Sequence, residues 1–153
     1  MEKLLISACL MGQNCKYNGG NNYTPLVEEL KKRYELVPVC PECFGGLPIP
    51  HPPSERVGER VVAKTGEDVT AAFRLGAEKT LEIAKAQGVT KAVLKERSPS
   101  CGCAGIYDGT FTRTLTSGEG VAAGMLRRSG VNVIGESQIK TWIKRREKTH
   151  ENQ

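Results

Sequence analysis

The stretch that decides the fold is Ala92-Val93-Leu94 followed by Ser98-Pro99-Ser100-Cys101-Gly102-Cys103. The first three residues predict a buried strand, and the six later ones place two hydroxyls, two thiols, a proline and a glycine in one turn. Serine, glycine and proline are usual in such a turn for backbone reasons, whereas cysteines are rare there. Two earlier cysteine pairs also follow strand-like runs: Cys9 with Cys15, and Cys40 with Cys43. This recurrence is the first indication of function.

Four short apolar runs have the character of parallel strands that are buried on both faces of a sheet. They cover residues 4–8, 35–39, 91–95 and 131–134. Pro38 cannot donate a ladder hydrogen bond, so the second run is expected at an edge of the sheet. Amphipathic segments between the runs predict helices over residues 25–33, 69–84, 119–128 and 138–148.

Strands that alternate with helices predict an α/β fold: a small Rossmann-like, three-layer domain with a mostly parallel four-stranded sheet and helices on both faces. Right-handed crossovers favour the strand order 2-1-3-4. With 153 residues and no internal repeat or linker, the chain is expected to form a single domain over 1–153. Residues 41–53 are expected to be an irregular Pro- and Gly-rich loop, followed by a small hairpin around 64–66.

Composition predicts a cytoplasmic protein without a membrane partner. Hydrophobic residues are 39% and charged residues 25% of the chain, and no run is long enough to span a bilayer. In the reducing cytoplasm, the six cysteines are expected to be metal ligands or reactive thiols rather than three disulfides. The net charge of +5 comes largely from the C-terminal segment, where a solvated face is expected rather than a nucleic-acid footprint. The basic residues there are Lys140, Lys144, Arg145, Arg146 and Lys148.

Three thiols are predicted to converge on one edge of the sheet. Cys9, Cys40 and Cys101 follow the first, second and third strands, and ligands in such sheets bind beyond the carboxyl ends of the strands. Three or four thiolates around one point select zinc or an iron–sulfur cluster, and single thiols from separate strands suit a cluster in a cleft. The alternative, that a cysteine is only a small buried hydrophobic residue, weighs most for Cys43 and Cys103.

Longer motifs surround these thiols. They are Ser7-x-Cys9-Leu10-x-Gly12-x-x-Cys15-x-Tyr17-x-Gly19, then Pro38-Val39-Cys40-Pro41-Glu42 with Gly46-Leu47-Pro48-x-Pro50, then Leu94-Lys95-x-x-Ser98-Pro99-Ser100-Cys101-Gly102. In these motifs the chain resembles the thiouracil desulfurase family, over essentially its whole length.

The resemblance implies a [4Fe-4S] cluster that is held by Cys9, Cys40 and Cys101 and has one iron open to substrate. The implied reaction removes sulfur from a thiolated pyrimidine without net redox change and leaves uracil and sulfide. The partner would be a small thiolated nucleobase or nucleoside, and the chain would be a monomer or a dimer.

The resemblance also implies roles for polar residues near these cysteines. Glu42 would be the acid/base, and Ser98 or Ser100 would position substrate or water. A carboxylate two residues from a ligand cysteine is well placed to deprotonate water, although it could also be a solvated loop residue. Family members usually have arginine where His51 stands, and His51 is expected to be a loop residue rather than a ligand.

Two other functions are open on the residues alone. A zinc-stabilised binding module would hold one zinc ion and bind RNA through the basic C-terminal helix. A sulfur-carrier cluster protein would transfer sulfide stoichiometrically without turnover. The concentration of Cys, Ser, Glu and Gly at strand ends, with few aromatic residues, favours the enzyme.

Overall fold

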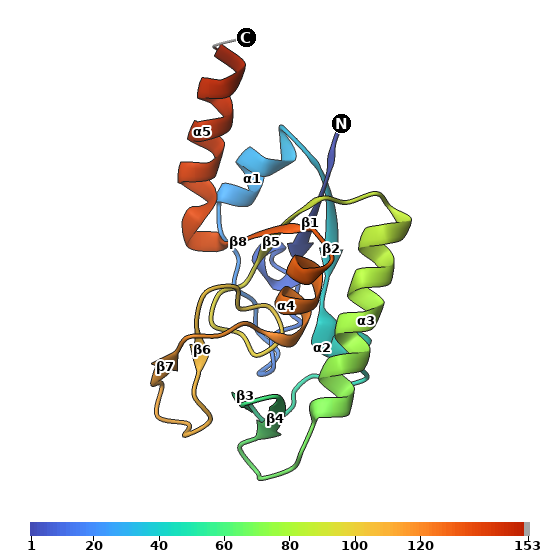
Figure 1. Cartoon of the computed structure of the whole chain (residues 1–153), viewed down its shortest axis with the longest axis vertical. Helices are drawn as coiled ribbons and strands as arrows, with labels where there is room; N and C mark the ends of the chain where they lie inside the picture. The colour runs from blue at the N-terminus through green and yellow to red at the C-terminus, as the bar shows by residue number, and fades with distance from the viewer. Residues whose placement is uncertain (152–153) are drawn as a thin grey trace.

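The centre of the protein is a parallel sheet of four strands in the order β2-β1-β5-β8 (Figure 1). The computed structural model describes the backbone of residues 1–151 and the side chains of residues 1–145. The strands are β1 (Lys3–Ser7), β2 (Glu35–Val39), β5 (Lys91–Leu94) and β8 (Asn132–Gly135). All three neighbouring pairs are parallel. The predicted α/β fold and the predicted strand order 2-1-3-4 are therefore confirmed.

The register places the most apolar strands in the middle of the sheet. In β1, Leu5 pairs with Val37 of β2 on one side and with Ala92 of β5 on the other. Pro38 lies on β2, which is an edge strand as predicted. Proline has no N–H to donate, and an edge strand needs no hydrogen bond on the side that has no neighbouring strand.

Helices cover both faces of the sheet, as expected (Figure 1). One core cluster joins the sheet to α3 (Thr70–Ala86) and α4 (Val121–Arg128), through residues such as Ala84 and Leu126. The other joins it to α1 (Leu26–Lys31) and α5 (Ile139–Glu151), through Leu30 and Ile139. Burying apolar side chains on both faces explains why the strand sequences are almost continuously hydrophobic.

The boundaries of α3 follow the expected signals. Asp68 accepts hydrogen bonds from both the backbone N–H and the hydroxyl of Thr70 at the start of the helix. Gly88, the second residue after its end, takes a left-handed conformation (φ 66°).

Two predictions for the middle of the chain are wrong in part. Residues 41–53 contain a helical turn, α2 (Pro41–Phe44), because Pro41 at the first helical position favours a helix start. The hairpin consists of β3 (Ser54–Val57) and β4 (Arg60–Ala63), so its turn lies at 58–59 rather than at 64–66. The expected turn forms as a second one, where Gly66 N–H donates to the Ala63 carbonyl.

A second short hairpin follows β5, and residues 108–114 connect its two strands. It pairs β6 (Ile106–Tyr107) with β7 (Leu115–Thr116). Both hairpins lie beyond the carboxyl ends of the sheet strands (Figure 1). Short 3-10 helices, Ala8–Met11 and Glu136–Gln138, follow β1 and β8.

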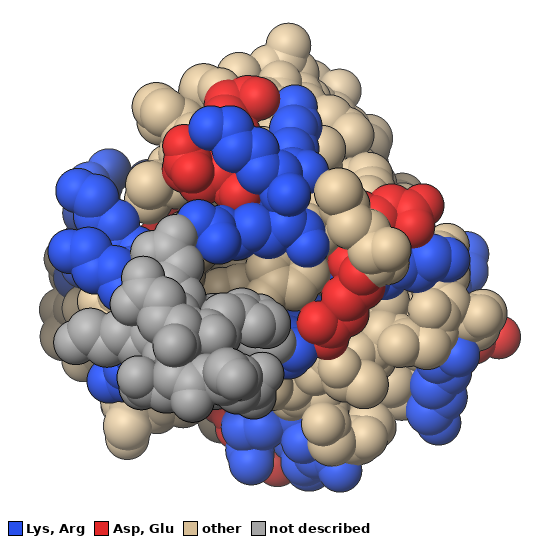
Figure 2. Space-filling view, turned by 90° about the horizontal axis from the view of Figure 1, so that it is seen from above, with Lys and Arg blue, Asp and Glu red and all other residues tan. Residues whose placement is uncertain are grey.

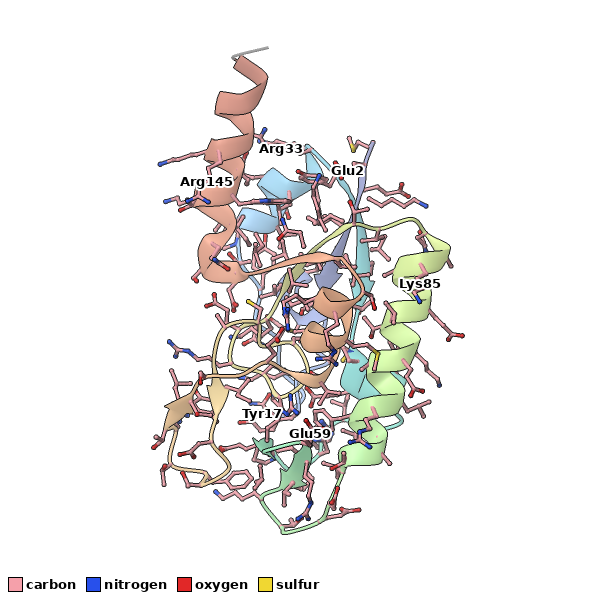
Figure 3. All side chains as sticks on the ribbon, viewed as in Figure 1. Glu2, Tyr17, Arg33, Glu59, Lys85 and Arg145 are labelled. Atoms are coloured by element: carbon pink, nitrogen blue, oxygen red, sulfur yellow. The ribbon has the colours of Figure 1, made fainter. Side chains whose placement is uncertain are left out.

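The basic C-terminal segment lies at the opposite end of the molecule from these hairpins. Arg145 of α5 and Arg33 lie at that end, whereas Tyr17 lies near the hairpin that contains Glu59 (Figure 3). In the view onto this end, Lys and Arg side chains form several groups with Asp and Glu between them (Figure 2). The side chains of Arg146 and Lys148 lie outside the described residues. None of the described helices combines the length and the apolar character that crossing a bilayer requires.

Helix α2 packs on α3 through glycines. A Cβ atom on Gly76 of α3 would clash with the carbonyl oxygen of Pro41, and one on Gly45 would clash with the carbonyl oxygen of Ala72. This close contact holds the turn that contains Cys40, Glu42 and Cys43 against the long helix.

Replacing Gly76 with alanine tests this contact. In most helix interiors this change stabilises a protein by about 0.5–1 kcal/mol. Here the methyl group displaces α2, so we expect the free energy of unfolding to fall by about 1–3 kcal/mol in urea denaturation. Gly124→Ala in α4 is the matched control, because the added methyl would meet the flexible end of Arg128 at 3.0 Å and should be tolerated. Equal stabilisation of both variants would show that α2 does not depend on this glycine.

Candidate active site

A cleft of about 490 Å³ lies at the carboxyl ends of β1, β2 and β5. Three parallel strands end there, and each is followed by a cysteine that lines the cleft: Cys9, Cys40 and Cys101. Cys15 lines it as well, and so do the polar residues Glu42, Ser98 and Ser100. The structure therefore brings all six residues predicted for the site into one cavity.

The loop after β5 is held by the beginning of α4. Val121 N–H donates to the Pro99 carbonyl at 2.9 Å, and the N–H groups of Ala122 and Ala123 both donate to the Ser100 carbonyl, at 2.9 and 3.1 Å. These amides lie in the first turn of the helix and have no partner within it. The loop thus supplies their acceptors, and the helix in turn fixes the loop residues that face the cleft.

Close packing at Gly120 makes these bonds possible. A Cβ atom there would overlap the carbonyl group of Ser100 and the amide nitrogen of Cys101. Gly120 N–H also donates to the carbonyl of Gly102 at 2.6 Å. Any side chain at Gly120 would push the loop away from α4.

The two thiols at the inner end of the cleft are held by hydroxyl and amide groups. Cys101 is 5% exposed, and this burial raises the pKa of its thiol to about 12. The Ser100 hydroxyl lies 3.7 Å from Cys101 Sγ. Burial also raises the pKa of Cys9, whose Sγ accepts a hydrogen bond from the Asn22 amide at 3.4 Å.

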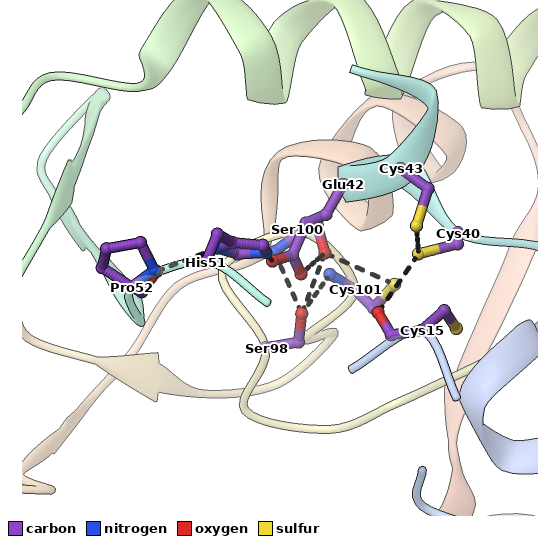
Figure 4. A network of polar contacts seen from close by, with 9 residues as sticks. All are labelled: Cys15, Cys40, Glu42, Cys43, His51, Pro52, Ser98, Ser100 and Cys101. Atoms are coloured by element: carbon purple, nitrogen blue, oxygen red, sulfur yellow. Dashed lines mark hydrogen bonds and ion pairs between the residues drawn. The ribbon is translucent and has the colours of Figure 1, made fainter. Parts of the chain in front are cut away.

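Cys40 lies in a cluster of thiols at the start of α2. A hydrogen bond from the Cys15 thiol, reinforced by Cys43, lowers the pKa of Cys40 to about 6, although burial opposes the change. Cys40 Sγ lies 3.2 Å from Cys43 Sγ and 3.8 Å from the Cys15 carbonyl oxygen (Figure 4). Cys103 packs against the hydrophobic cluster beneath α3 and α4, which agrees with the alternative that it acts as a small hydrophobic residue.

Glu42 and the two serines form a directed chain of hydrogen bonds (Figure 4). Ser98 Oγ accepts from the backbone N–H groups of Ser100 and Cys101, at 3.2 and 3.1 Å. Its own proton is therefore free for Ser100 Oγ, 2.9 Å away, and Ser100 donates in turn to Glu42 Oε2 at 2.9 Å. Both hydroxyl protons therefore point toward the carboxylate.

His51 contacts the other oxygen of Glu42, a contact that sequence analysis missed. Its side chain is 6% exposed, and Nε2 lies 3.2 Å from Glu42 Oε1. Nδ1 lies 2.9 Å from the Pro52 carbonyl, which can only accept, so Nδ1 has a proton. The contact between Nε2 and Glu42 Oε1 raises the pKa of His51.

A buried carboxylate, also missed from sequence, shapes the outer wall of the cleft. Glu55 of β3 is 8% exposed, and its Oε1 accepts from the backbone N–H groups of Gly109 at 3.0 Å and Phe111 at 3.1 Å. Phe111 and Arg113 both adopt left-handed backbone conformations, with φ of 59° and 60°. Such conformations are uncommon for bulky residues and cluster at functional sites. The bonds to Glu55 hold the loop so that Phe111 and Arg113 line the cleft.

The comparisons with known proteins agree with this geometry. The model of the 2-thiouracil desulfurase family matches residues 4–138. The chain belongs to the 2-thiouracil desulfurase family. The family predicted from the sequence motifs, and with it an enzyme that cleaves a C–S bond, is therefore confirmed.

Two relatives of this desulfurase are similar over nearly their whole length. The uncharacterized protein YbbK of Bacillus subtilis (strain 168) is 38% identical over 146 residues, which are 89% of this chain and 97% of that protein. A solved structure, the [4Fe-4S]-dependent thiouracil desulfidase TudS, is 44% identical and superposes with a TM-score of 0.86. That match covers 92% of this chain and 95% of TudS, and its fold agrees with the predicted α/β class.

Titration of His51 tests its contact with Glu42. The desulfurase has two histidines, so His150→Gln leaves one imidazole signal to follow by NMR. We expect the pKa of His51 to lie above its ordinary value of about 6.5 and to fall toward it in Glu42→Gln. Because folding raises this pKa, the contact stabilises the protein below about pH 6.5, and that stabilisation is lost as the pH rises through the folded-state value. An unchanged titration in Glu42→Gln would contradict the contact.

Limited proteolysis tests the role of Glu55. In Glu55→Ala the N–H groups of Gly109 and Phe111 lose their acceptor, at a cost of about 1–3 kcal/mol. A cost of about 1.4 kcal/mol makes the open loop tenfold more populated, so trypsin should cleave after Arg113 about tenfold faster. Glu59→Ala, an exposed change in the turn of the same hairpin, should leave the rate unchanged. Equal rates in the two variants would show that Glu55 does not hold the loop.

Proposed function

We propose that this desulfurase hydrolyses a thiolated pyrimidine, such as 2-thiouracil, to the oxo compound and sulfide, with a [4Fe-4S] cluster held by Cys9, Cys40 and Cys101. One observation supports this above all. Thiols from the ends of three parallel strands line the same cleft as a carboxylate with two aligned hydroxyls. The dependence of TudS on a [4Fe-4S] cluster supports the same cofactor.

The donor set fits such a cluster. Thiolates are the ligands that iron–sulfur clusters take, and these three come from separate strand ends around a cavity rather than around a point. Among the described residues, no three His, Cys, Asp or Glu side chains are grouped as they would be around a single metal ion. When bound with three protein ligands, the cluster would supply an open iron that acts as a Lewis acid toward the substrate sulfur.

Glu42 is the residue that we assign to proton transfer. Replacing C=S by C=O with water requires removal of a proton from the attacking water and delivery of protons to the leaving sulfide, with no change in oxidation state. Ser100 donates to Oε2 of Glu42, and His51 faces Oε1. The carboxylate is therefore held from both sides while remaining 20% exposed to the cleft.

The serines have distinct roles in this proposal. Ser100 is buried and orients Glu42 directly, whereas Ser98 fixes the loop through its bonds to two backbone amides and orients Ser100. The aromatic residues Tyr17, Tyr107 and Phe111 line the same cleft and offer apolar surfaces for a pyrimidine ring.

The broader setting follows from the thiols and the size of the cleft. We place the enzyme in the cytoplasm because all six cysteines are free, as is usual in a reducing compartment. A cleft of about 490 Å³ suits a nucleobase or nucleoside rather than a macromolecule. We further propose that residues 1–153 form a single domain and that the enzyme is a monomer or a dimer.

Anaerobic analysis of iron, acid-labile sulfide and turnover tests the proposal. We expect about four irons and four sulfides per chain in the wild type, and loss of both in Cys101→Ala. Glu42→Gln should keep the cluster but lose about 10²–10⁴-fold in the rate of sulfide release from 2-thiouracil.

The controls separate the alternative functions. Glu59→Gln changes an exposed residue that does not line the cleft, so it should match the wild type in both measurements. Zinc without iron would favour the zinc-stabilised binding module. One sulfide released per chain without turnover would favour the sulfur carrier. A Glu42→Gln variant with unchanged turnover would refute the role of Glu42.

A further inference from the structure

Cys43 has no part in the proposed reaction, yet its sulfur lies against a proposed cluster ligand. Cys40 and Cys43 form a Cys-x-x-Cys motif across the start of α2, and their sulfur atoms are 3.2 Å apart (Figure 4). Cys40 Sγ is therefore closer to Cys43 Sγ than to the Cys15 carbonyl oxygen, which lies 3.8 Å away. Two free thiols at this spacing in a cytoplasmic protein are typical of a redox-active pair.

Backbone hydrogen bonds hold the two cysteines close together. Phe44 N–H donates to the Cys40 carbonyl at 3.0 Å, and Gly45 N–H donates to the Pro41 carbonyl at 2.9 Å, so the turn between the cysteines is closed. The packing of Pro41 on Gly76 holds this turn against α3. The cysteines are thus already placed for a bond that needs only a small movement of two side chains.

Both thiols of the pair are accessible to a small oxidant. Cys40 and Cys43 are partly exposed, whereas Cys101 is buried. An oxidant that enters from solvent therefore meets the pair before it meets the inner ligand.

We propose that Cys40 and Cys43 form a reversible disulfide when Cys40 is not bound to iron, and that this disulfide prevents cluster loading until a thiol reductant opens it. In the reaction, two S–H bonds break and one S–S bond forms. A low-molecular-weight disulfide takes the two hydrogens and is reduced to two thiols, through a mixed disulfide on one of the cysteines. The effect on cluster loading rests on the proposed role of Cys40 as a cluster ligand. A sulfur atom in a disulfide cannot bind iron as a thiolate.

The first experiment concerns the disulfide alone. Cluster-free protein is reduced, freed of reductant under anaerobic conditions, and treated with oxidised glutathione; iodoacetamide then blocks remaining thiols before trypsin digestion. The tryptic peptide 34–56 contains Cys40 and Cys43 and no other cysteine. We expect this peptide to have no iodoacetamide label and to be two hydrogen atoms lighter than the reduced, unlabelled peptide. After reduction with dithiothreitol, it should take up two iodoacetamide labels.

Two single-cysteine variants show which thiols take part. Cys43→Ser should abolish the disulfide, whereas Cys15→Ser, which removes the other thiol beside Cys40, should still form it. A peptide 34–56 that keeps both labels in the wild type would overturn the proposal, and so would a disulfide between Cys40 and Cys15.

The second experiment measures loading. Oxidised wild type should fail to take up iron and sulfide, and reductant should restore uptake. Reduced Cys43→Ser that has not been treated with glutathione should load to the level of reduced wild type. Failure of the reduced Cys43→Ser variant to load would make Cys43 a ligand and overturn the proposal. If reduced wild type takes up no iron although the disulfide forms, the proposed function and the loading effect fail together, while the disulfide stands.

Discussion

The backbone N–H groups at the start of α4 donate hydrogen bonds to carbonyl oxygens of the loop after β5, and the arrangement of the site depends on these bonds. A helix terminus leaves its first amides without partners, and a strand-end loop leaves carbonyls exposed, so each satisfies the other. Because α4 is packed on the sheet through its buried alanines and leucine, these hydrogen bonds hold the loop in a fixed position relative to the core. Ser98, Ser100 and Cys101 are thereby fixed relative to the ends of β1 and β2.

The polar network built on this loop is fully paired at its centre. Glu42 has Ser100 on one oxygen and His51 on the other, and Ser98 supplies the proton that completes the chain. A partly buried polar network of this kind is stable only when each member has a partner. These paired contacts hold one carboxylate in a fixed orientation beside the thiols, which is the preorganisation that the proposed proton transfer requires.

Much of the fold could be predicted from local pattern. The four apolar runs, the edge position of Pro38 and the alternation of strands with helices were sufficient for the sheet order, because parallel strands with right-handed crossovers leave few topologies. Helix α2 was missed because its four residues lie in a stretch rich in Pro and Gly, where periodicity is not visible. The position of the β3–β4 turn was misplaced for a similar reason, since two adjacent turns contain glycine: Gly58 in the hairpin and Gly66 after it.

The sequence by itself determined the fold class, the family and six of the residues that line the cleft, because these cysteines and polar residues lie in loops that follow strands whose ends must meet. Only the tertiary structure decided how those residues are paired. The approach of His51 to Glu42, the hold of Glu55 on the 108–114 loop and the contact of Cys43 with Cys40 depend on the packing of α2 and the hairpins. These contacts join segments that have no periodic pattern that would predict their pairing. Only the folded chain brings them together.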